Sequence, residues 1–212
     1  MGIICLKNNK GNFEKFTDNL SQIKGFWQRV HADDFDKDGD LDLIVGNYGL
    51  NYPFYSRDDL SEQLVALKKK YTSHELYSTA TTEEVVSVFP TKQAKKLEAK
   101  TLETIYLENK NGRFEVKKLP IQAQFSPVFA ITSTDINKDG FADLVLAGNQ
   151  SHSRVRIGTI DANYGQVFLN DGKSNFKFHS NLGVRGDVKD LKVIGNQLFV
   201  GVNNKKTKIL EF

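Results

Sequence analysis

Short apolar runs, separated by segments rich in asparagine and glycine, make up most of the chain outside its second quarter. Residues 43–45 and 144–146 are two such runs, and each is followed by a Gly-Asn pair at or near its end. Runs of this length that contain β-branched residues and end in turn residues are typical of buried strands rather than helices. The pattern therefore predicts a chain built mainly of short strands.

One turn pattern occurs three times, at residues 6–13, 107–114 and 169–176. In each copy a leucine and a phenylalanine flank an Asn/Gly-rich turn, which is typical of a β-hairpin. An acidic segment begins 21 residues after Phe13 and again 21 residues after Phe114. Repeated units that cannot bury both of their own faces stack on one another as the blades of a propeller. We therefore expect an all-β fold, a β-propeller or partial propeller of antiparallel blades.

The second quarter of the chain has a helical pattern instead. Residues 56–59 favour a helix start, and Leu60, Leu64, Leu67 and Tyr71 then recur at helical spacing. A second start at residues 81–84 ends at Pro90, and a third short helix is expected over residues 94–99. These features predict a small helical insertion between blades.

The chain is accordingly divided into four segments. Residues 1–50 form a blade with an acidic loop, and residues 51–100 form the helical insertion. Residues 101–165 form a second blade with an acidic loop. Residues 166–212 form a degenerate terminal blade, because they carry too few carboxylates for a metal loop.

The two acidic loops, residues 34–42 and 135–143, have oxygen-bearing side chains at positions 1, 3, 5 and 9 and a glycine at position 6. The glycine permits a sharp bend that turns alternate side chains inward. A set of hard oxygen ligands suits calcium better than zinc or magnesium. We expect two Ca2+ sites, with Asp40 and Phe141 contributing backbone carbonyls. The predicted ligands are Asp34, Asp36, Asp38, Asp40 and Asp42 in the first loop and Asp135, Asn137, Asp139, Phe141 and Asp143 in the second.

An EF-hand and a solvated turn are the two alternative interpretations of these loops. An EF-hand needs a glutamate at position 12, but that position holds Val45 in one loop and Leu146 in the other. A solvated turn is the ordinary explanation of a single match, but two matches in one register weaken it. Clustered carboxylates also repel each other by about 1 kcal/mol per pair, which a divalent cation would remove. Because Asn137 is uncharged, we expect the first loop to bind calcium more tightly than the second.

These loops resemble those of FG-GAP or VCBS-type repeat proteins. Residues 25–27, 46–51 and 55–60 resemble more narrowly the bacterial cartilage-acidic-protein-like subgroup. The resemblance implies a propeller of about seven blades, with the loop residues given above as calcium ligands. It also implies an exported or surface-attached protein that acts in adhesion or ligand binding.

Composition and charge narrow the functional classes further. The 212 residues carry a net charge of +3, which rises to +7 with two calcium ions bound, so an acidic partner gains plausibility. Nucleic acid is not expected, because basic motifs interleaved with aromatic residues are missing. The sequence has no apolar stretch long enough for a transmembrane segment. Met1 leads directly into a strand-like run without a leader, so we expect a mature fragment of a longer chain that is extracellular, on the cell surface or periplasmic.

The sequence thus predicts a calcium-binding β-propeller module that binds a protein or glycan ligand, with structural calcium and no catalytic residues. The alternative is a calcium-dependent polysaccharide lyase or hydrolase, which would require Arg154, Arg156 and Tyr164 to converge on a calcium site. A third hypothesis places a partner-docking surface on the helices around residues 60–71. The oligomeric state is left open.

Overall fold

The computed structural model describes residues 2–16, 19–50, 57–88, 99–152 and 158–212. The chain divides into two compact units. The sheet unit comprises Met1–Tyr52 and Glu98–Phe212, and the helical unit comprises Pro53–Leu97. Each unit is described by itself below.

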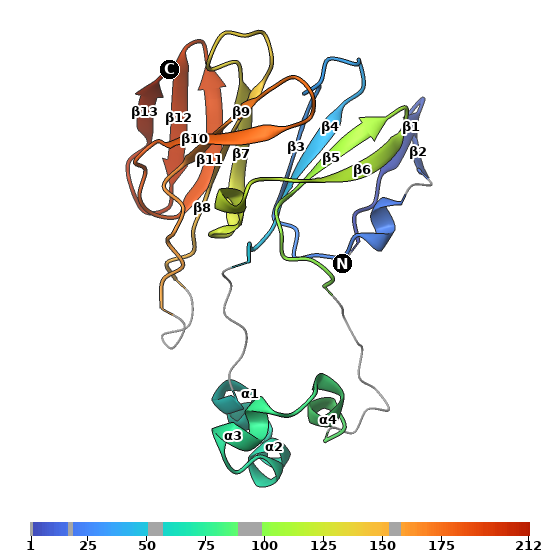
Figure 1. Cartoon of the computed structure of the whole chain (residues 1–212), viewed down its shortest axis with the longest axis vertical. Coiled ribbons are helices and arrows are strands. Elements are labelled where there is room, and N and C mark those ends of the chain that lie inside the picture. Colours follow the sequence, from blue (N-terminus) through green and yellow to red (C-terminus); the bar gives the residue numbers. More distant parts are fainter. Residues whose placement is uncertain (1, 17–18, 51–56, 89–98, 153–157) are drawn as a thin grey trace. The chain divides into compact units, whose positions relative to one another are not determined.

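Four antiparallel sheets make up the sheet unit (Figure 1). The N-terminal hairpin consists of β1 (Leu6–Asn9) and β2 (Asn12–Lys15). Blade 1 consists of β3 (Arg29–Asp33), β4 (Asp42–Gly46), β5 (Ile105–Lys110) and β6 (Arg113–Lys118). Blade 2 consists of β7 (Val128–Thr134), β8 (Asp143–Gly148), β9 (Gln166–Asn170) and β10 (Phe176–Asn181). Blade 3 consists of β11 (Val188–Ile194), β12 (Gln197–Val202) and β13 (Lys208–Glu211). Two short 3-10 helices, η1 (Leu20–Gln22) and η3 (Ile121–Gln124), precede blades 1 and 2.

The sheets stand in a row in which the first strand of each blade lies beside the first strand of the next. β3 contacts β7, and β7 contacts β11. The remaining strands of each blade follow in chain order away from that shared line. This arrangement is a partial β-propeller, as the repeated hairpins and apolar runs predict.

The helical unit is inserted inside blade 1, which corrects the prediction that it lies between two blades. β4, which precedes it, pairs with β5, which follows it, and Leu43 lies opposite Leu107. The acidic loop joins the first two strands of a blade, so the strand after the loop is the second of four and not the last. The predicted segments 1–50, 101–165 and 166–212 therefore each contain strands of more than one sheet, and the terminal blade begins only at β11.

Three apolar layers hold the row of sheets together, each formed between neighbouring sheets. The layer between blades 1 and 2 contains Phe35, Ile44, Tyr106, Leu144, Leu146 and Phe168. The layer between blades 2 and 3 contains Val145, Val167, Leu191, Leu198 and Val200. The layer between the hairpin and blade 1 contains Leu20, Val45, Ile105, Leu107 and Phe114, with Ile3 and Cys5 against them. Each fully buried side chain of this kind contributes about 1.5–3 kcal/mol, so a blade is stabilised mainly by its neighbours.

The sheet register also corrects the alignment of the third repeat. Leu43 pairs with Leu107, and at the same place in blade 2 Leu144 pairs with Phe168, not with Leu169. The turn after β9 is one residue longer than the turn after β5, because Asn170 pairs with Phe176 whereas Asn109 pairs with Phe114. Matching Leu169 with Leu107 therefore shifts the alignment by one residue at this strand.

The helical unit contains α1 (Arg57–Gln63), α2 (Val65–Lys70), α3 (His74–Ser78) and α4 (Thr82–Val86). The apolar stripe predicted over residues 60–71 is divided at Leu64, whose extended backbone (φ −137°) separates α1 from α2. Leu67 and Tyr71 are buried, and the Tyr71 ring packs edge-on against Tyr77. The expected start at Thr81 is confirmed as a capping box with Glu84.

Residues 51–56, Pro90 and residues 94–98 of the predicted insertion lie outside the described residues. None of the described helices is long and apolar enough to cross a membrane.

Candidate metal centre

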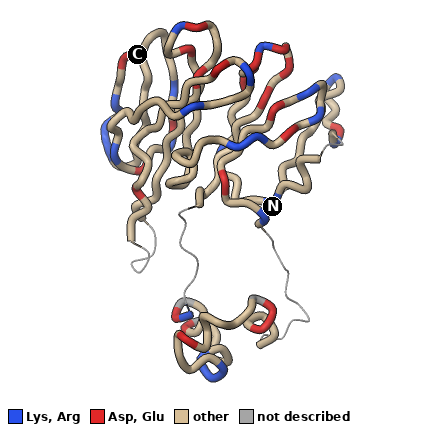
Figure 2. Tube along the Cα trace, viewed as in Figure 1, with Lys and Arg blue, Asp and Glu red and all other residues tan. Residues whose placement is uncertain are grey.

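Both acidic loops lie at the same end of their blades, each between the first and second strand (Figure 2). The backbone φ angles of the two loops match at positions 4 and 6. Lys37 and Gly39 in the first loop have φ of 62° and 94°, and Lys138 and Gly140 in the second have φ of 62° and 96°. Two left-handed residues at positions 4 and 6 fold the chain back on itself, and glycine supplies the second without steric cost. The glycine thus occupies the bend for which the sequence predicts it.

The first loop gathers three carboxylates. Asp34, Asp36 and Asp38 each place an oxygen so that all three oxygens lie within 4.8 Å of one another. Asp34 Oδ2 accepts a hydrogen bond from the N–H of Gly39 at 3.1 Å. Asp34 Oδ1 is buried and has no hydrogen-bond donor among the described residues. A buried carboxylate oxygen without a partner is costly, and a cation bound beside these three carboxylates would remove that cost.

Asp42, the ninth residue of the first loop, is not one of the three grouped carboxylates. It is fully buried and accepts hydrogen bonds from the N–H of Asn109 (2.7 Å), the hydroxyl of Tyr106 (2.7 Å) and the N–H of Phe35 (3.2 Å). Burial raises the pKa of Asp42, and these hydrogen bonds oppose the rise. Asp42 therefore anchors the loop to β5, whereas its predicted role as a calcium ligand stays a prediction.

The second loop satisfies more of its own oxygens. Asp135 accepts hydrogen bonds from the N–H groups of Gly140 (2.8 Å) and Asp139 (3.1 Å). The Asn137 amide donates to Asp139 at 2.8 Å. The N–H of Phe141, the Asn137 amide and the nearby Lys37 ammonium lower the pKa of Asp139. No group of three acidic side chains gathers in the described part of this loop.

Asp143 repeats the role of Asp42 in the second loop. It is fully buried and accepts hydrogen bonds from the N–H groups of Ile136 and Asn170, both at 2.9 Å. At position 7, the Asp40 carboxylate accepts a hydrogen bond from the N–H of Asn111 at 2.8 Å. The Phe141 ring lies 5.0 Å from the Lys37 ammonium. Asp40 and Phe141, whose backbone carbonyls are the predicted ligands, are thus held in place by contacts of their side chains.

Asn170 connects the two loops, a role that the sequence analysis missed. Its amide donates to the carbonyl oxygens of Phe35 in the first loop (2.8 Å) and Ala142 in the second (3.1 Å). Lys37 of the first loop also covers Phe141 of the second. The sequence feature that could have pointed to Asn170 is the asparagine that stands near the start of each hairpin turn. The two loops therefore form one connected surface.

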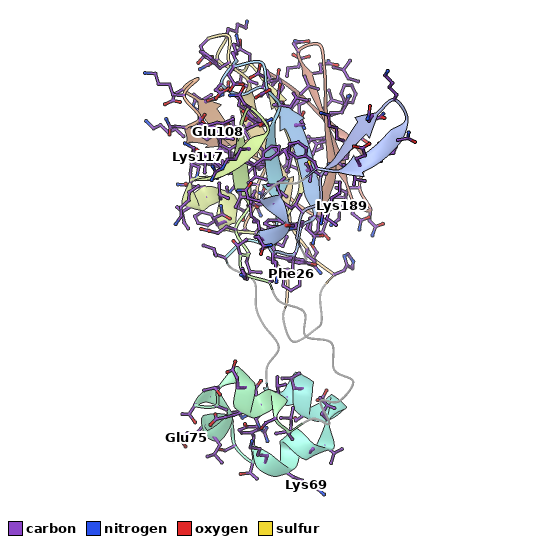
Figure 3. All side chains as sticks on the ribbon, turned by 90° about the vertical axis from the view of Figure 1, so that its right-hand side faces the viewer. Phe26, Lys69, Glu75, Glu108, Lys117 and Lys189 are labelled. Carbon is purple, nitrogen blue, oxygen red and sulfur yellow. The ribbon has the colours of Figure 1, made fainter. Side chains whose placement is uncertain are left out.

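A second missed residue, Glu108, lies beside the first loop. Its carboxylate pairs with the ammonium groups of Lys110 (2.9 Å) and Lys117 (3.2 Å) and accepts a hydrogen bond from Ser174, which also lies 3.4 Å from Asp36 (Figure 3). Burial raises the pKa of Glu108, but Ser174, Lys110 and Lys117 together outweigh burial and lower it to about 2. Glu108 therefore stays ionised, and its charge is balanced by the two lysines.

Of the three residues required by the enzymatic alternative, only Tyr164 lies within the described part of the chain, and its strand end is away from the acidic loops. Tyr164 precedes β9 at the end of the strand opposite to Asn170, and its ring lies 5.3 Å from the Arg185 guanidinium. Arg154 and Arg156 lie outside the described residues. At residues 60–71 Leu67 and Tyr71 are buried inside the helical unit, whereas Leu64 and Val65 are exposed, so the docking hypothesis stays a prediction.

Residues 26–59 match the FG-GAP repeat family. The matched segment contains β3, the first acidic loop and β4, and it reaches into α1. No curated protein and no solved structure matches the chain. The match is consistent with an FG-GAP β-propeller protein, and the narrower cartilage-acidic-protein-like resemblance is not supported.

Proposed function

We propose that this chain is a calcium-stabilised β-propeller module of an exported or surface protein, acting in ligand binding or adhesion. The observation that carries the proposal is Asp34 Oδ1, a buried carboxylate oxygen without a hydrogen-bond donor among the described residues, beside the carboxylates of Asp36 and Asp38. The segment that contains this group is the one that matches the FG-GAP repeat.

Calcium in this proposal is structural. Asp34, Asp36 and Asp38 would hold the first ion, with the Asp40 carbonyl and Asp42 completing the oxygen set. The second ion would be held by Asp135, Asn137, Asp139, the Phe141 carbonyl and Asp143. A bound divalent cation removes a repulsion of about 1 kcal/mol per carboxylate pair and fixes the loop backbone.

A rigid loop surface is what a binding module requires. The two loops are already joined through Asn170 and Lys37, so fixing one loop would restrain the other. Functional sites are commonly built from loops that a rigid scaffold positions. The proposed ligand is a protein or glycan, and with two ions bound the net charge of +7 would favour an acidic one.

Isothermal titration calorimetry with CaCl2 tests the metal site directly. We expect the wild-type chain to take up calcium, and Asp34→Asn to weaken uptake at the first site at least about tenfold, because a charge-bearing ligand is lost. Asp190→Asn is the matched control, since Asp190 is an exposed aspartate of β11 paired with Arg29. Wild-type protein without calcium uptake, or an Asp34→Asn variant that binds like wild type, would overturn the proposal.

A further inference from the structure

The first strands of blades 2 and 3 each carry one extra residue at their second position. Phe129 in β7 and Lys189 in β11 have no partner in the sheet register, whereas the register of β3 in blade 1 is continuous. Val128 and Ile131 both pack in the layer between blades 1 and 2, although residues three apart in a regular strand face opposite sides. Each extra residue is therefore a β-bulge, and a bulge redirects the side chain that it carries.

The two bulges bring their side chains together. The Lys189 ammonium lies 3.7 Å from the centre of the Phe129 ring, which makes a cation–π contact between blade 3 and blade 2. Lys189 is an exposed residue. The same device at the same position of two neighbouring blades thus holds an accessible lysine against an aromatic ring.

The charge of Lys189 has no carboxylate within ion-pair distance in the described part of the chain. Both oxygens of Asp187 accept hydrogen bonds from the N–H of Ser151, at 2.8 and 3.0 Å. Asp190 pairs with Arg29 of blade 1 at 3.0 Å. Burial lowers the pKa of Lys189, and the charge of Asp187 opposes the fall. The ammonium is therefore fixed in place and can still pair with an anion.

Two more aromatic side chains extend this contact into blade 1. The Phe129 ring packs edge-on against Tyr48, with ring centres 6.3 Å apart, and Tyr48 packs edge-on against Phe26 at 6.0 Å. We call Phe26, Tyr48, Phe129 and Lys189 together the aromatic row. Phe26 is 48% exposed, so the row ends in an accessible ring. Figure 3 shows Phe26 and Lys189 in the lower half of the sheet unit.

The aromatic row crosses three blades at the strand ends away from the acidic loops. Phe26 precedes β3 and Tyr48 follows β4, whereas the acidic loops follow β3 and β7. The contacts of the row run between blades 1, 2 and 3 and not over the outer faces of the hairpin or of blade 3. Further sheets stacked on those outer faces would therefore lie beside the row.

We propose that the aromatic row binds an acidic glycan, with the Lys189 ammonium paired with a uronate carboxylate and the exposed Phe26 ring stacked on the C–H face of a neighbouring sugar. This assignment rests on the proposed function as a binding module and names its ligand class. A uronate joins a carboxylate to a ring with apolar C–H groups, which suits a cation that is followed by aromatic rings. An acidic peptide side chain offers the carboxylate without the C–H face, so the row favours the sugar.

Isothermal titration calorimetry with trigalacturonate, galactotriose and triglutamate tests the proposal. Galactotriose has sugar rings without carboxylates, and triglutamate has carboxylates without sugar rings. We expect wild-type protein to bind trigalacturonate, and the other two probes to bind at least about tenfold more weakly, because each lacks half of the recognised chemistry. A wild type that does not bind trigalacturonate, or that binds either of the other probes as tightly, would overturn the proposal.

Lys189→Met tests the cation, because methionine keeps an apolar stem against the Phe129 ring. We expect it to weaken trigalacturonate binding at least about tenfold. Lys192→Met is the matched control, since Lys192 is an exposed lysine of the same strand outside the aromatic row. It removes the same charge and should bind like wild type. Equal losses in the two variants would indicate attraction by net charge alone and would overturn the assigned site.

Phe26→Ala tests the other end of the row. It should lose trigalacturonate affinity, because the stacking ring is removed. Phe13→Ala is the control, since it removes an exposed ring of the N-terminal hairpin, and it should bind like wild type. A Phe26→Ala variant with unchanged affinity would overturn the stacking contact.

Calcium titration of Lys189→Met separates this site from the proposed calcium sites. The variant should take up calcium like wild type, because Lys189 lies at the strand end away from the acidic loops. Wild-type protein that takes up calcium but does not bind trigalacturonate would overturn the glycan site alone. Trigalacturonate binding without calcium uptake would support the glycan site and overturn the calcium sites.

Discussion

Asp42 accepts a hydrogen bond from the N–H of Asn109 at 2.7 Å, although 67 positions in the sequence separate them. The helical unit lies within that interval. Asp143 and Asn170 repeat the relationship in blade 2 at 2.9 Å over 27 positions. The ninth residue of each acidic loop therefore joins the loop to the third strand of its blade, whatever the length of the chain between them.

Replacement of Asp42 by alanine should lower the free energy of unfolding by about 2–4 kcal/mol, because the N–H groups of Asn109 and Phe35 and the buried Tyr106 hydroxyl lose their acceptor. Urea denaturation in the presence of a chelator would measure this change without a contribution from calcium. Asp38→Ala is the control in the same loop, since Asp38 is exposed, and it should change stability by less than about 0.5 kcal/mol. Equal effects of the two substitutions would contradict the anchoring role.

The two proposed calcium sites should differ in affinity. The Asp38→Asn variant retains the second loop, and the Asp139→Asn variant retains the first, with the substitution at position 5 in both cases. Calorimetry should give a smaller calcium dissociation constant for the Asp139→Asn variant, because the intact first loop has one more carboxylate. Equal constants in the two variants would contradict the expected order.

Calcium removal should also lower the melting temperature of the wild-type chain. A ligand at about 100 times its dissociation constant stabilises the folded state by about 2.7 kcal/mol. Thermal unfolding followed by circular dichroism with excess calcium and with chelator would measure the shift. A melting temperature that chelator leaves unchanged would argue against structural calcium.

Gly148 at the end of β8 should not tolerate a side chain. A Cβ atom there would lie 1.7 Å from the carbonyl oxygen of Pro127, which is backbone and cannot move aside easily. We expect Gly148→Ala to destabilise the chain by about 1–3 kcal/mol or more. Gly201→Ala in β12 is the matched control, because its Cβ would meet Asp190 at an ordinary 3.5 Å. Chemical denaturation of both variants gives the comparison, and similar losses would count against the close contact.

Acid should remove the stabilising contribution of Glu108. Its pKa is lowered from 4.5 to about 2 in the folded chain. The contribution is therefore fully present above pH 4.5 and is lost as the pH falls through 2. Glu108→Gln should be less stable than wild type at pH 7, and the difference should shrink as the pH falls below 4.5. Urea denaturation over this pH range would show the convergence.

Glu115→Gln is the control for that series. Glu115 is exposed and pairs with Lys110 at 3.1 Å, and exposed ion pairs contribute little. A stability difference between wild type and Glu108→Gln that does not depend on pH would contradict the assigned charge network.

The sequence alone determined the local structure of this protein. The strand–turn–strand units, the left-handed glycines at position 6 of both acidic loops and the capping box at Thr81 follow from residues close together in the chain. Turn chemistry and the alternation of side chains act over a few residues. The local structure that they produce can therefore be predicted from the sequence without knowledge of the fold. The grouping of Asp34, Asp36 and Asp38 also arises within one turn.

Only the tertiary structure decided which strands share a sheet and which side chains they enclose. The pairing of β4 with β5 across the helical unit depends on burial between sheets, and the one-residue shift that brings Phe168 opposite Leu144 depends on the length of the following turn. Asp42 became an anchor because the N–H of Asn109 lies in reach only after that pairing. Likewise, Leu6 and Leu107 have the same local sequence pattern, and their different exposure is set by whether another sheet lies against them.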